Sequence, residues 1–156
     1  MKMILQRQID APPSRVFEVF TDLDRLEEVV PEIVKTETLT DGPLGVGSRI
    51  RSTRKMFGKE ASEEMEFVAF DPPTGYQLEA RSHGAHYLTG YRFEPAGGGT
   101  LVHFEFTGKA ESLMAKLMTP LSMLCAGAMK KMMVREFDAL QAECEGRAET
   151  QPATAS

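Results

Sequence analysis

The sequence predicts one α+β domain in which a curved antiparallel sheet wraps around a long C-terminal helix and leaves an apolar cavity. Between residues 33 and 109, segments of strand length alternate with turn-forming residues, which is typical of an antiparallel meander. From 111 to 146 the apolar residues recur at helical spacing instead. The elements before residue 33 are too short for a β-α-β crossover, so a parallel sheet is not expected.

The first thirty residues predict a strand followed by two short helices. Residues 3–9 form the strand, and Pro12 and Pro13 end it because proline cannot continue a ladder. Pro13 can stand in the first turn of a helix, and a second helix runs from 24 to 30 and stops before Pro31.

Turn residues predict how the strands pair. A two-residue type II′ turn at Gly58-Lys59 pairs Arg54 with Glu63 and Ile50 with Phe67. The next turn, at Pro72-Pro73, pairs Phe67 with Leu78 and Ala69 with Tyr76. The later hairpins then pair Ser82 with Tyr87, Leu78 with Tyr91, Tyr76 with Phe93, Tyr91 with Phe104 and Phe93 with Val102.

One face of this sheet is predicted to be covered by the long helix, and its residues sort into rows. The row nearest the start of the helix is polar and consists of Arg54, Glu63, Ser82, Tyr87 and Gly108. A neighbouring apolar row consists of Ile50, Phe67, Leu78, Tyr91 and Phe104. Glu64, Glu66, Glu79, Arg81, Arg92, His103 and Glu105 are expected on the outward face.

The long helix is predicted to present a wide apolar face that is rich in methionine. Its members are Leu121, Cys125, Ala128, Met129, Met132, Met133, Phe137 and Leu140. Pro120 predicts a kink or a fresh start with Thr119 as the N-cap. Gly146 is expected to end the helix, so the domain covers residues 1–146, and 147–156 is expected to be a disordered polar tail.

The charge and composition of the chain limit the kinds of partner, metal and compartment that the sequence predicts. The chain has 18 basic and 23 acidic residues, a net charge of -5, and no basic patch, so a nucleic-acid partner is not expected. No apolar run suits a signal peptide or a transmembrane segment, which predicts a cytoplasmic protein. Cys125 and Cys144 are too far apart along one helix for a disulfide, and neither has a second ligand at metal-site spacing. No metal and no cofactor are expected.

The segment Ile9–Phe17, with Asp22 and Pro31 after it, resembles the opening of the START-like, or SRPBCC, superfamily and its polyketide cyclase/dehydrase-like branch. The segments 45–50, 70–73, 90–95 and 97–102 are similar to strand and turn segments that recur in that group, and the resemblance covers about residues 2 to 146. It implies a helix-grip fold of order β-α-α-β6-α, with a deep cavity used across the superfamily for lipids, sterols, plant hormones and polyketides. It implies no shared reaction, and no catalytic motif can be carried over.

Twelve residues on the inner face and the helix are candidate ligand-binding residues: Arg54, Glu63, Met65, Phe67, Leu78, Ser82, Tyr87, Tyr91, Phe104, Phe106, Met129 and Met132. Arginine can bind a carboxylate through two hydrogen bonds, so the polar row can orient a ligand's carboxylate or carbonyl. An ordinary cross-strand pair of Arg54 with Glu63 is equally compatible with the sequence. Deformable methionines suit a pocket that accepts varied shapes, and plain core packing also explains them.

The function favoured by these patterns is binding or transport of a hydrophobic small molecule, such as a lipid, a polyketide or an aromatic metabolite. One alternative is a cyclase or dehydratase that uses Arg54, Glu63, Tyr87 or Tyr91 for acid–base chemistry. Another is an interaction module with a collapsed cavity, which would use a sheet edge or an apolar patch over 113–124. A homodimer is a possible assembly, and the histidines His83, His86 and His103 lack the partners that a general base or metal ligand needs.

Overall fold

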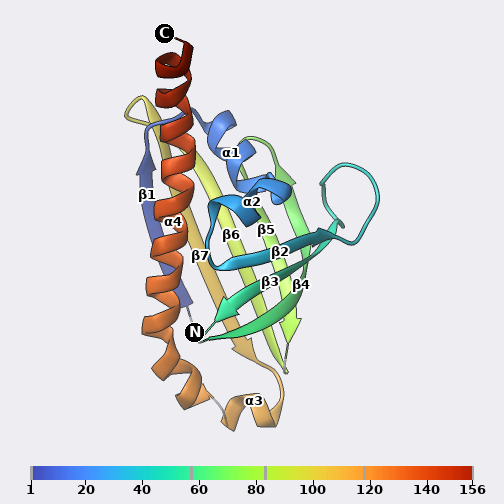
Figure 1. Cartoon of the computed structure of the whole chain (residues 1–156). Coiled ribbons are helices and arrows are strands. Elements are labelled where there is room, and N and C mark those ends of the chain that lie inside the picture. Colours follow the sequence, from blue (N-terminus) through green and yellow to red (C-terminus); the bar gives the residue numbers. More distant parts are fainter. Residues whose placement is uncertain (1, 57, 83, 118, 156) are drawn as a thin grey trace.

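The computed structural model describes residues 2–56, 58–82, 84–117 and 119–155, with side chains described except at 56, 115, 119–125 and 147–155 (Figure 1). The elements in chain order are β1 (Lys2–Ile9), α1 (Pro13–Thr21), α2 (Leu23–Val29), β2 (Ile33–Thr38), β3 (Arg49–Met56), β4 (Lys59–Asp71), β5 (Gly75–Ser82), β6 (Ala85–Ala96), β7 (Gly99–Ala110), α3 (Leu113–Leu117) and α4 (Thr119–Ala155). This order confirms the predicted β-α-α-β6-α arrangement and adds the short helix α3.

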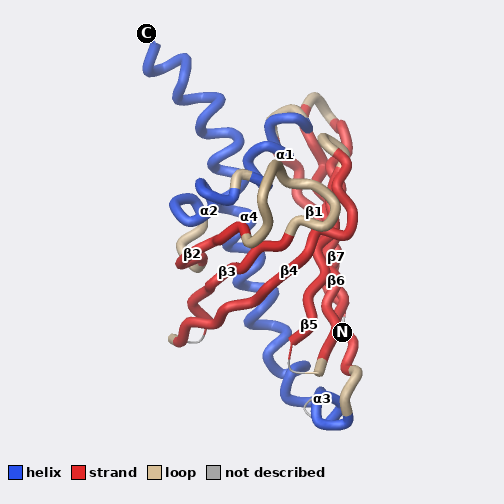
Figure 2. The backbone as a smooth tube through the Cα atoms, turned by 90° about the vertical axis from the view of Figure 1, so that its right-hand side faces the viewer, coloured by secondary structure: helices blue, strands red, loops and turns tan. Residues whose placement is uncertain are grey.

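The strands form one antiparallel sheet in the order β1-β7-β6-β5-β4-β3-β2. Figure 1 shows α4 running lengthwise beside this sheet, with α1 and α2 near the half of the helix that leads to the C-terminus. In the turned view of Figure 2, α4 runs diagonally behind β2, β3 and β4. The sheet therefore has one covered face and one face toward solvent, as the alternation of apolar and polar residues predicts.

The β3–β4 hairpin differs from the prediction by two residues. Met56 pairs with Lys59, so Lys59 belongs to the ladder instead of the loop, and Arg54 lies opposite Ala61 instead of Glu63. Gly58 has a positive φ of 77°, but β4 begins directly after it, whereas the predicted type II′ turn has Lys59 as its second loop residue. A shift of two residues keeps every side chain on its predicted face, because strands have a period of two.

A bulge interrupts the β4–β5 pairing. Phe67 pairs with Leu78 as predicted, but the register then shifts, and Ala69 lies opposite Gln77 and Phe70 opposite Tyr76. The prediction that Ala69 faces Tyr76 is therefore wrong, because one extra residue, Val68, stands between two ladder positions. The bulge turns the ring of Phe70 toward the core, where its centroid lies 5.5 Å from that of Phe67.

Of the two remaining hairpins, β5–β6 differs from the predicted register and β6–β7 has the predicted register. Ser82 pairs with Ala85 and Tyr76 with Tyr91, so the predicted pairs of Ser82 with Tyr87, Leu78 with Tyr91 and Tyr76 with Phe93 are wrong by two residues. Gly84, with a φ of 75°, permits this tighter loop, and His83 lies outside the described residues. The pairs Tyr91 with Phe104 and Phe93 with Val102 are confirmed.

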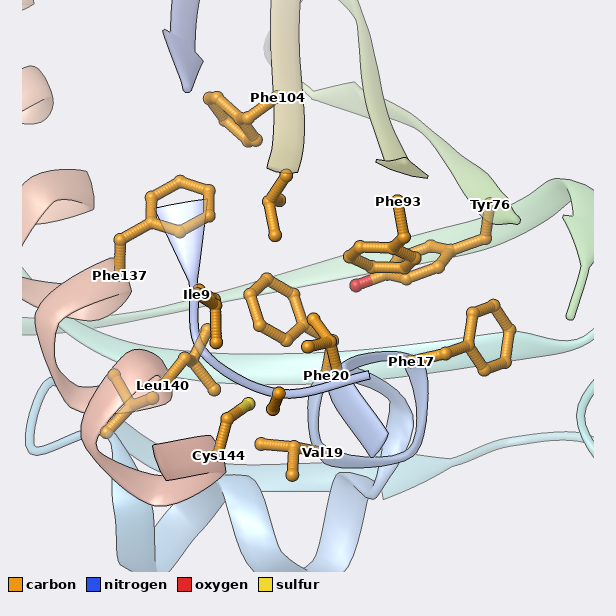
Figure 3. Packing of buried hydrophobic residues seen from close by; sticks show 14 of the residues in the cluster. Ile9, Phe17, Val19, Phe20, Tyr76, Phe93, Phe104, Phe137, Leu140 and Cys144 are labelled. Atoms are coloured by element: carbon orange, nitrogen blue, oxygen red, sulfur yellow. The ribbon is translucent and has the colours of Figure 1, made fainter. Parts of the chain in front are cut away.

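An aromatic cluster forms the centre of the core between the sheet, α1 and α4 (Figure 3). The ring of Phe17 meets those of Phe70, Tyr76 and Phe93 edge to face at centroid distances of 5.4, 5.9 and 5.8 Å. Phe137 of α4 contacts Phe104 in the same way at 5.5 Å. Edge-to-face geometry aligns ring hydrogens with ring faces, so these contacts stabilise the core beyond simple burial.

Two features mark the ends of the helical region: α3 has exposed apolar side chains, and α4 is longer than predicted. In α3, Leu113, Met114 and Leu117 are 76%, 72% and 70% exposed. The backbone of α4 continues past Gly146, where the sequence predicts an end, to Ala155. Glycine can adopt helical dihedrals, so its presence does not force a helix to stop. Disorder of the segment 147–156 stays a prediction.

Gly75, the first residue of β5, lies where strand backbones approach too closely for a side chain. A Cβ added there would overlap the carbonyl oxygen of Tyr91, whereas one added at Gly45 would meet nothing within 4 Å. We expect Gly75→Ala to lower the free energy of unfolding by about 2–4 kcal/mol because the β5–β6 pairing must distort. Urea denaturation measures this, and an effect no larger than that of the control Gly45→Ala would contradict it.

Candidate functional site

A cavity of about 60 Å³ lies between the sheet, the first two helices and α4. Most of its wall is apolar, but several polar side chains also border it. The lining residues are Phe20, Leu23, Leu26, Ile33, Thr36, Ile50, Ser52, Arg54, Met65, Phe67, Tyr76, Leu78, Tyr91, Glu136 and Leu140. An apolar hollow with a few converging polar groups is the usual form of a small-molecule site, so this cavity is the candidate functional site.

The polar part of the wall is an ion pair between β3 and α4. Arg54 Nη1 donates to Glu136 Oε2 at 2.7 Å, and Nη2 donates to Oε1 at 3.2 Å. The side chains of Arg54 and Glu136 are 24% and 6% exposed. Two parallel hydrogen bonds fix the orientation of both groups, so the pair is a rigid feature of the cavity wall.

The two charges of this pair depend on each other. Burial by itself would lower the pKa of Arg54, but the charge of Glu136 and its hydrogen bonds outweigh burial and raise that pKa. A buried carboxylate without a cation would be strongly disfavoured, because few solvent dipoles reach it. The ion pair itself adds no net charge to the cavity wall.

Two tyrosine hydroxyls belong to the same wall. The rings of Tyr76 and Tyr91 stack with centroids 4.7 Å apart. Burial raises the pKa of both phenols, and the carboxylate of Glu136 raises both further, whereas Arg54 acts in the opposite direction on Tyr91. Tyr91 is half-buried and borders the cavity. At neutral pH both hydroxyls are protonated and can donate hydrogen bonds.

Thr36 and Ser52 complete the polar wall with neutral hydroxyls. Their residues are 9% and 6% exposed. The Thr36 Oγ1 atom has no hydrogen-bond partner among the described residues, although it is buried. A buried hydroxyl without a partner is unfavourable, so a polar group placed near Thr36 would gain a hydrogen bond.

The structure brings five of the twelve predicted residues to the cavity: Arg54, Met65, Phe67, Leu78 and Tyr91. Seven lie elsewhere, namely Glu63, Ser82, Tyr87, Phe104, Phe106, Met129 and Met132. Phe104 is buried beside Tyr91 at a centroid distance of 5.2 Å. Tyr87 stacks on Phe106 at 5.6 Å, and Met129 packs against the core. Of the predicted polar row, Arg54 borders the cavity, and Glu63, which does not line it, acts electrostatically on both Arg54 and Tyr87.

The sequence interpretation missed ten of the fifteen lining residues, and Glu136 is the charged one among them. The helix signal was present, because Glu136 falls on the stripe that Met129, Met133 and Leu140 form at spacings of four, three and four. A charged residue within an apolar stripe indicates a buried partner of opposite charge. The predicted pairing of Arg54 with Glu63 is wrong, because Ser52 lies opposite Glu63 and Arg54 extends to α4.

Further polar contacts fix α4 on both of its flanks. Toward β1, Arg7 Nη1 donates to Asp138 Oδ1 at 2.7 Å and to Gln141 Oε1 at 2.8 Å. On the other flank, Arg135 Nε donates to Glu32 Oε1 at 3.0 Å, in front of β2. The half of the helix that borders the cavity is thus held at a defined rotation about its own axis.

A larger hollow of about 380 Å³ lies around Gly90 on the outward face of the sheet. Two of its charged side chains pair with residues beside the hollow: Arg92 Nη1 lies 2.9 Å from Glu94 Oε2, and Glu105 Oε1 lies 3.4 Å from Lys2 Nζ. It has no covering helix and no buried charge among the described residues that line it. We therefore place the candidate site in the inner cavity despite its smaller volume.

The described residues contain no group of three His, Cys, Asp or Glu side chains arranged to hold a metal ion. No helix within the described part of the chain is long and apolar enough to cross a membrane.

A curved antiparallel sheet around a long C-terminal helix, with a cavity between them, defines the helix-grip class. The chain belongs to the family described as polyketide cyclase / dehydrase and lipid transport, whose model matches residues 2–145. This confirms the START-like, SRPBCC assignment. No curated protein matches the sequence.

Solved structures agree with the fold. A protein from Thermus thermophilus is 21% identical, with a TM-score of 0.78 over 94% of this chain and 99% of that chain. Ara h 8.0201 is 17% identical, with a TM-score of 0.75 over 94% and 98%. The di-domain ARO/CYC StfQ from the steffimycin biosynthetic pathway is 8% identical, with a TM-score of 0.75 over 95% of this chain and 51% of that chain. Identities this low establish the fold alone.

The buried pair predicts an asymmetry between single and double substitutions. Glu136→Gln should lower the free energy of unfolding by about 2–4 kcal/mol, because Arg54 loses its counter-charge inside the cavity wall. The double variant Arg54→Met/Glu136→Leu should lie within about 1 kcal/mol of the parent, since it leaves no unpaired charge. The control Glu64→Gln, which affects exposed ion pairs on the same hairpin, should change it by about 0–1 kcal/mol. Chemical denaturation would refute the assignment if Glu136→Gln matched that control.

The raised tyrosine pKa values predict a loss of stability in alkali. In the unfolded chain the phenols ionise near their ordinary pKa of 10.0, whereas Tyr76 and Tyr91 stay protonated in the fold above that pH. The unfolded state then binds fewer protons, so the stability falls as the pH rises above about 10. Absorbance titration of the tyrosines in the near ultraviolet should show half-buried Tyr87 ionising first and the other two only with unfolding. Smooth ionisation of all three in the folded protein would contradict this.

Proposed function

We propose that this protein binds an apolar small molecule in the cavity between the sheet and α4. The observation that supports this most directly is the wall itself, in which aromatic and aliphatic side chains lie around the partly buried Arg54–Glu136 pair. A site of this composition gains affinity from apolar burial and gains orientation from its few polar groups. Membership of a family described by polyketide cyclisation, dehydration and lipid transport supports the same class of ligand.

The size of the cavity constrains how such a ligand enters. A volume of about 60 Å³ has room for roughly four water molecules. Sites for drug-sized ligands measure about 300–1,000 Å³. Binding must therefore displace side chains of the wall, and Met65 is a half-buried residue of that wall. Unbranched thioether side chains change shape at low cost, so methionine suits a cavity that expands around its ligand.

The enzymatic alternative, a cyclase or dehydratase, is favoured by one observation. The hydroxyls of Tyr76 and Tyr91 share a cavity with the Arg54–Glu136 pair. Because burial raises their pKa, these phenols are better suited to donate a hydrogen bond to a carbonyl than to act as a base at neutral pH. Tyr91 would then polarise a substrate carbonyl, and turnover beyond binding is what separates this function from the first.

The proposal predicts that filling the inner cavity weakens ligand binding. We expect 1-anilinonaphthalene, a neutral apolar fluorophore, to bind the parent protein with enhanced emission. Met65→Trp should weaken this binding by at least about tenfold, because the indole occupies the space that the ligand needs. Leu88→Trp, which places the same indole beside the outward hollow, should leave the affinity unchanged. Fluorescence titration measures both, with circular dichroism to verify folding.

Two results would count against the proposal. Absence of any saturable binding by the parent protein would remove the ligand-binding function for this probe class. Loss of binding in Leu88→Trp but not in Met65→Trp would move the site to the outward face of the sheet.

A further inference from the structure

Resting on the function proposed above, we infer that the cavity selects apolar molecules whose polar group is uncharged, a hydroxyl or a carbonyl, and rejects those that carry a carboxylate. The sequence alone suggests the opposite possibility, that Arg54 orients a ligand's carboxylate. The contacts of Arg54 and the neutral hydroxyls around it lead to the inferred selectivity.

The face of the Arg54 guanidinium formed by its two terminal nitrogens is already occupied by a carboxylate. Both terminal nitrogens of its guanidinium bond to the two oxygens of Glu136, at 2.7 and 3.2 Å. This is the two-bond geometry in which an arginine would bind a ligand's carboxylate. A ligand acid would therefore have to compete with a carboxylate that the fold itself supplies.

An entering carboxylate would also meet a negative charge of the same kind. Glu136 is 5% exposed, so little water screens it from a neighbour in the cavity. Two carboxylates that share a desolvated site repel each other, and one of them must take up a proton or leave. Either event costs binding free energy that a neutral ligand does not lose.

Neutral polar groups find partners in the same wall. The hydroxyls of Tyr76 and Tyr91 can donate to a carbonyl, and that of Ser52 can donate or accept. Thr36 Oγ1 is buried without a partner among the described residues, so a ligand hydroxyl or carbonyl near it would satisfy an unpaired group. The wall therefore offers hydrogen bonds to an uncharged group without requiring a counter-charge.

A ring-matched series tests this selectivity at neutral pH. Equilibrium dialysis compares three compounds that share one apolar ring system. Naphthalene has no polar group, 2-naphthol has a neutral hydroxyl, and 2-naphthoate has a carboxylate. We expect 2-naphthol to bind at least about tenfold more tightly than 2-naphthoate, a difference of about 1.4 kcal/mol. Met65→Trp should weaken the binding of 2-naphthol, which assigns it to the inner cavity.

The variant Glu136→Gln provides the sharpest comparison. It keeps the shape of the side chain and frees the charge of Arg54, so the ratio of 2-naphthoate to 2-naphthol affinity should rise at least about tenfold. Arg54→Met/Glu136→Leu has no free arginine and should continue to reject 2-naphthoate. This double variant retains no unpaired charge, so it tests the inference even where Glu136→Gln folds poorly. Glu64→Gln, outside the cavity, should leave the ratio unchanged.

Each outcome has a defined meaning. Preference of the parent protein for 2-naphthoate would overturn the inferred selectivity and leave the proposed binding function intact. A folded Glu136→Gln variant without a gain in relative 2-naphthoate affinity would also overturn it. Tight binding of 2-naphthoate by the double variant would show that Arg54 and Glu136 do not govern selectivity. If none of the three compounds binds the parent protein, the proposed function fails for aromatic ligands together with the inference.

Discussion

The hydrogen-bonded ion pair between Arg54 and Glu136 connects the middle of α4 to β3, the strand next to one edge of the sheet. A buried pair of this kind adds little net stability, because desolvation of two charges offsets much of their attraction. Its effect is geometric. With Glu136 bonded to β3, Phe137 and Leu140 of the same helix pack in the hydrophobic core, and the cavity lies beside the ion pair.

The same helix is held by contacts with β1 and with the residue in front of β2, at the two opposite edges of the sheet. Polar contacts on both flanks and apolar contacts between them define the rotation of α4 about its own axis. This division of roles accounts for a cavity wall that contains both apolar and charged residues. Apolar residues provide most of its surface, and its charged residues serve the positioning of the helix before they serve any ligand.

Much of the fold follows from the sequence because strand periodicity and turn residues act locally. The outward residues His103 and Glu105 and the inward residues Phe67 and Tyr91 lie on their predicted faces, although two hairpins differ in register by two residues. The loop boundary at Gly58 depends on a backbone dihedral that composition does not determine. The ion pair between α4 and β3 is harder still to predict from the sequence, because Arg54 and Glu136 are 82 residues apart in the chain. No local pattern joins them, so the site could be predicted only in part.

The bulge at Val68 bears on how related cavities differ in size. It decides which of two successive residues, Ala69 or the much larger Phe70, projects into the interior, while strand pairing resumes on both sides of it. Loss of a single residue from this part of β4 would exchange a benzyl group for a methyl group in the interior and leave the other ladders unchanged. Homologues could therefore gain interior volume through one-codon deletions, without remodelling the helix or the remaining strands.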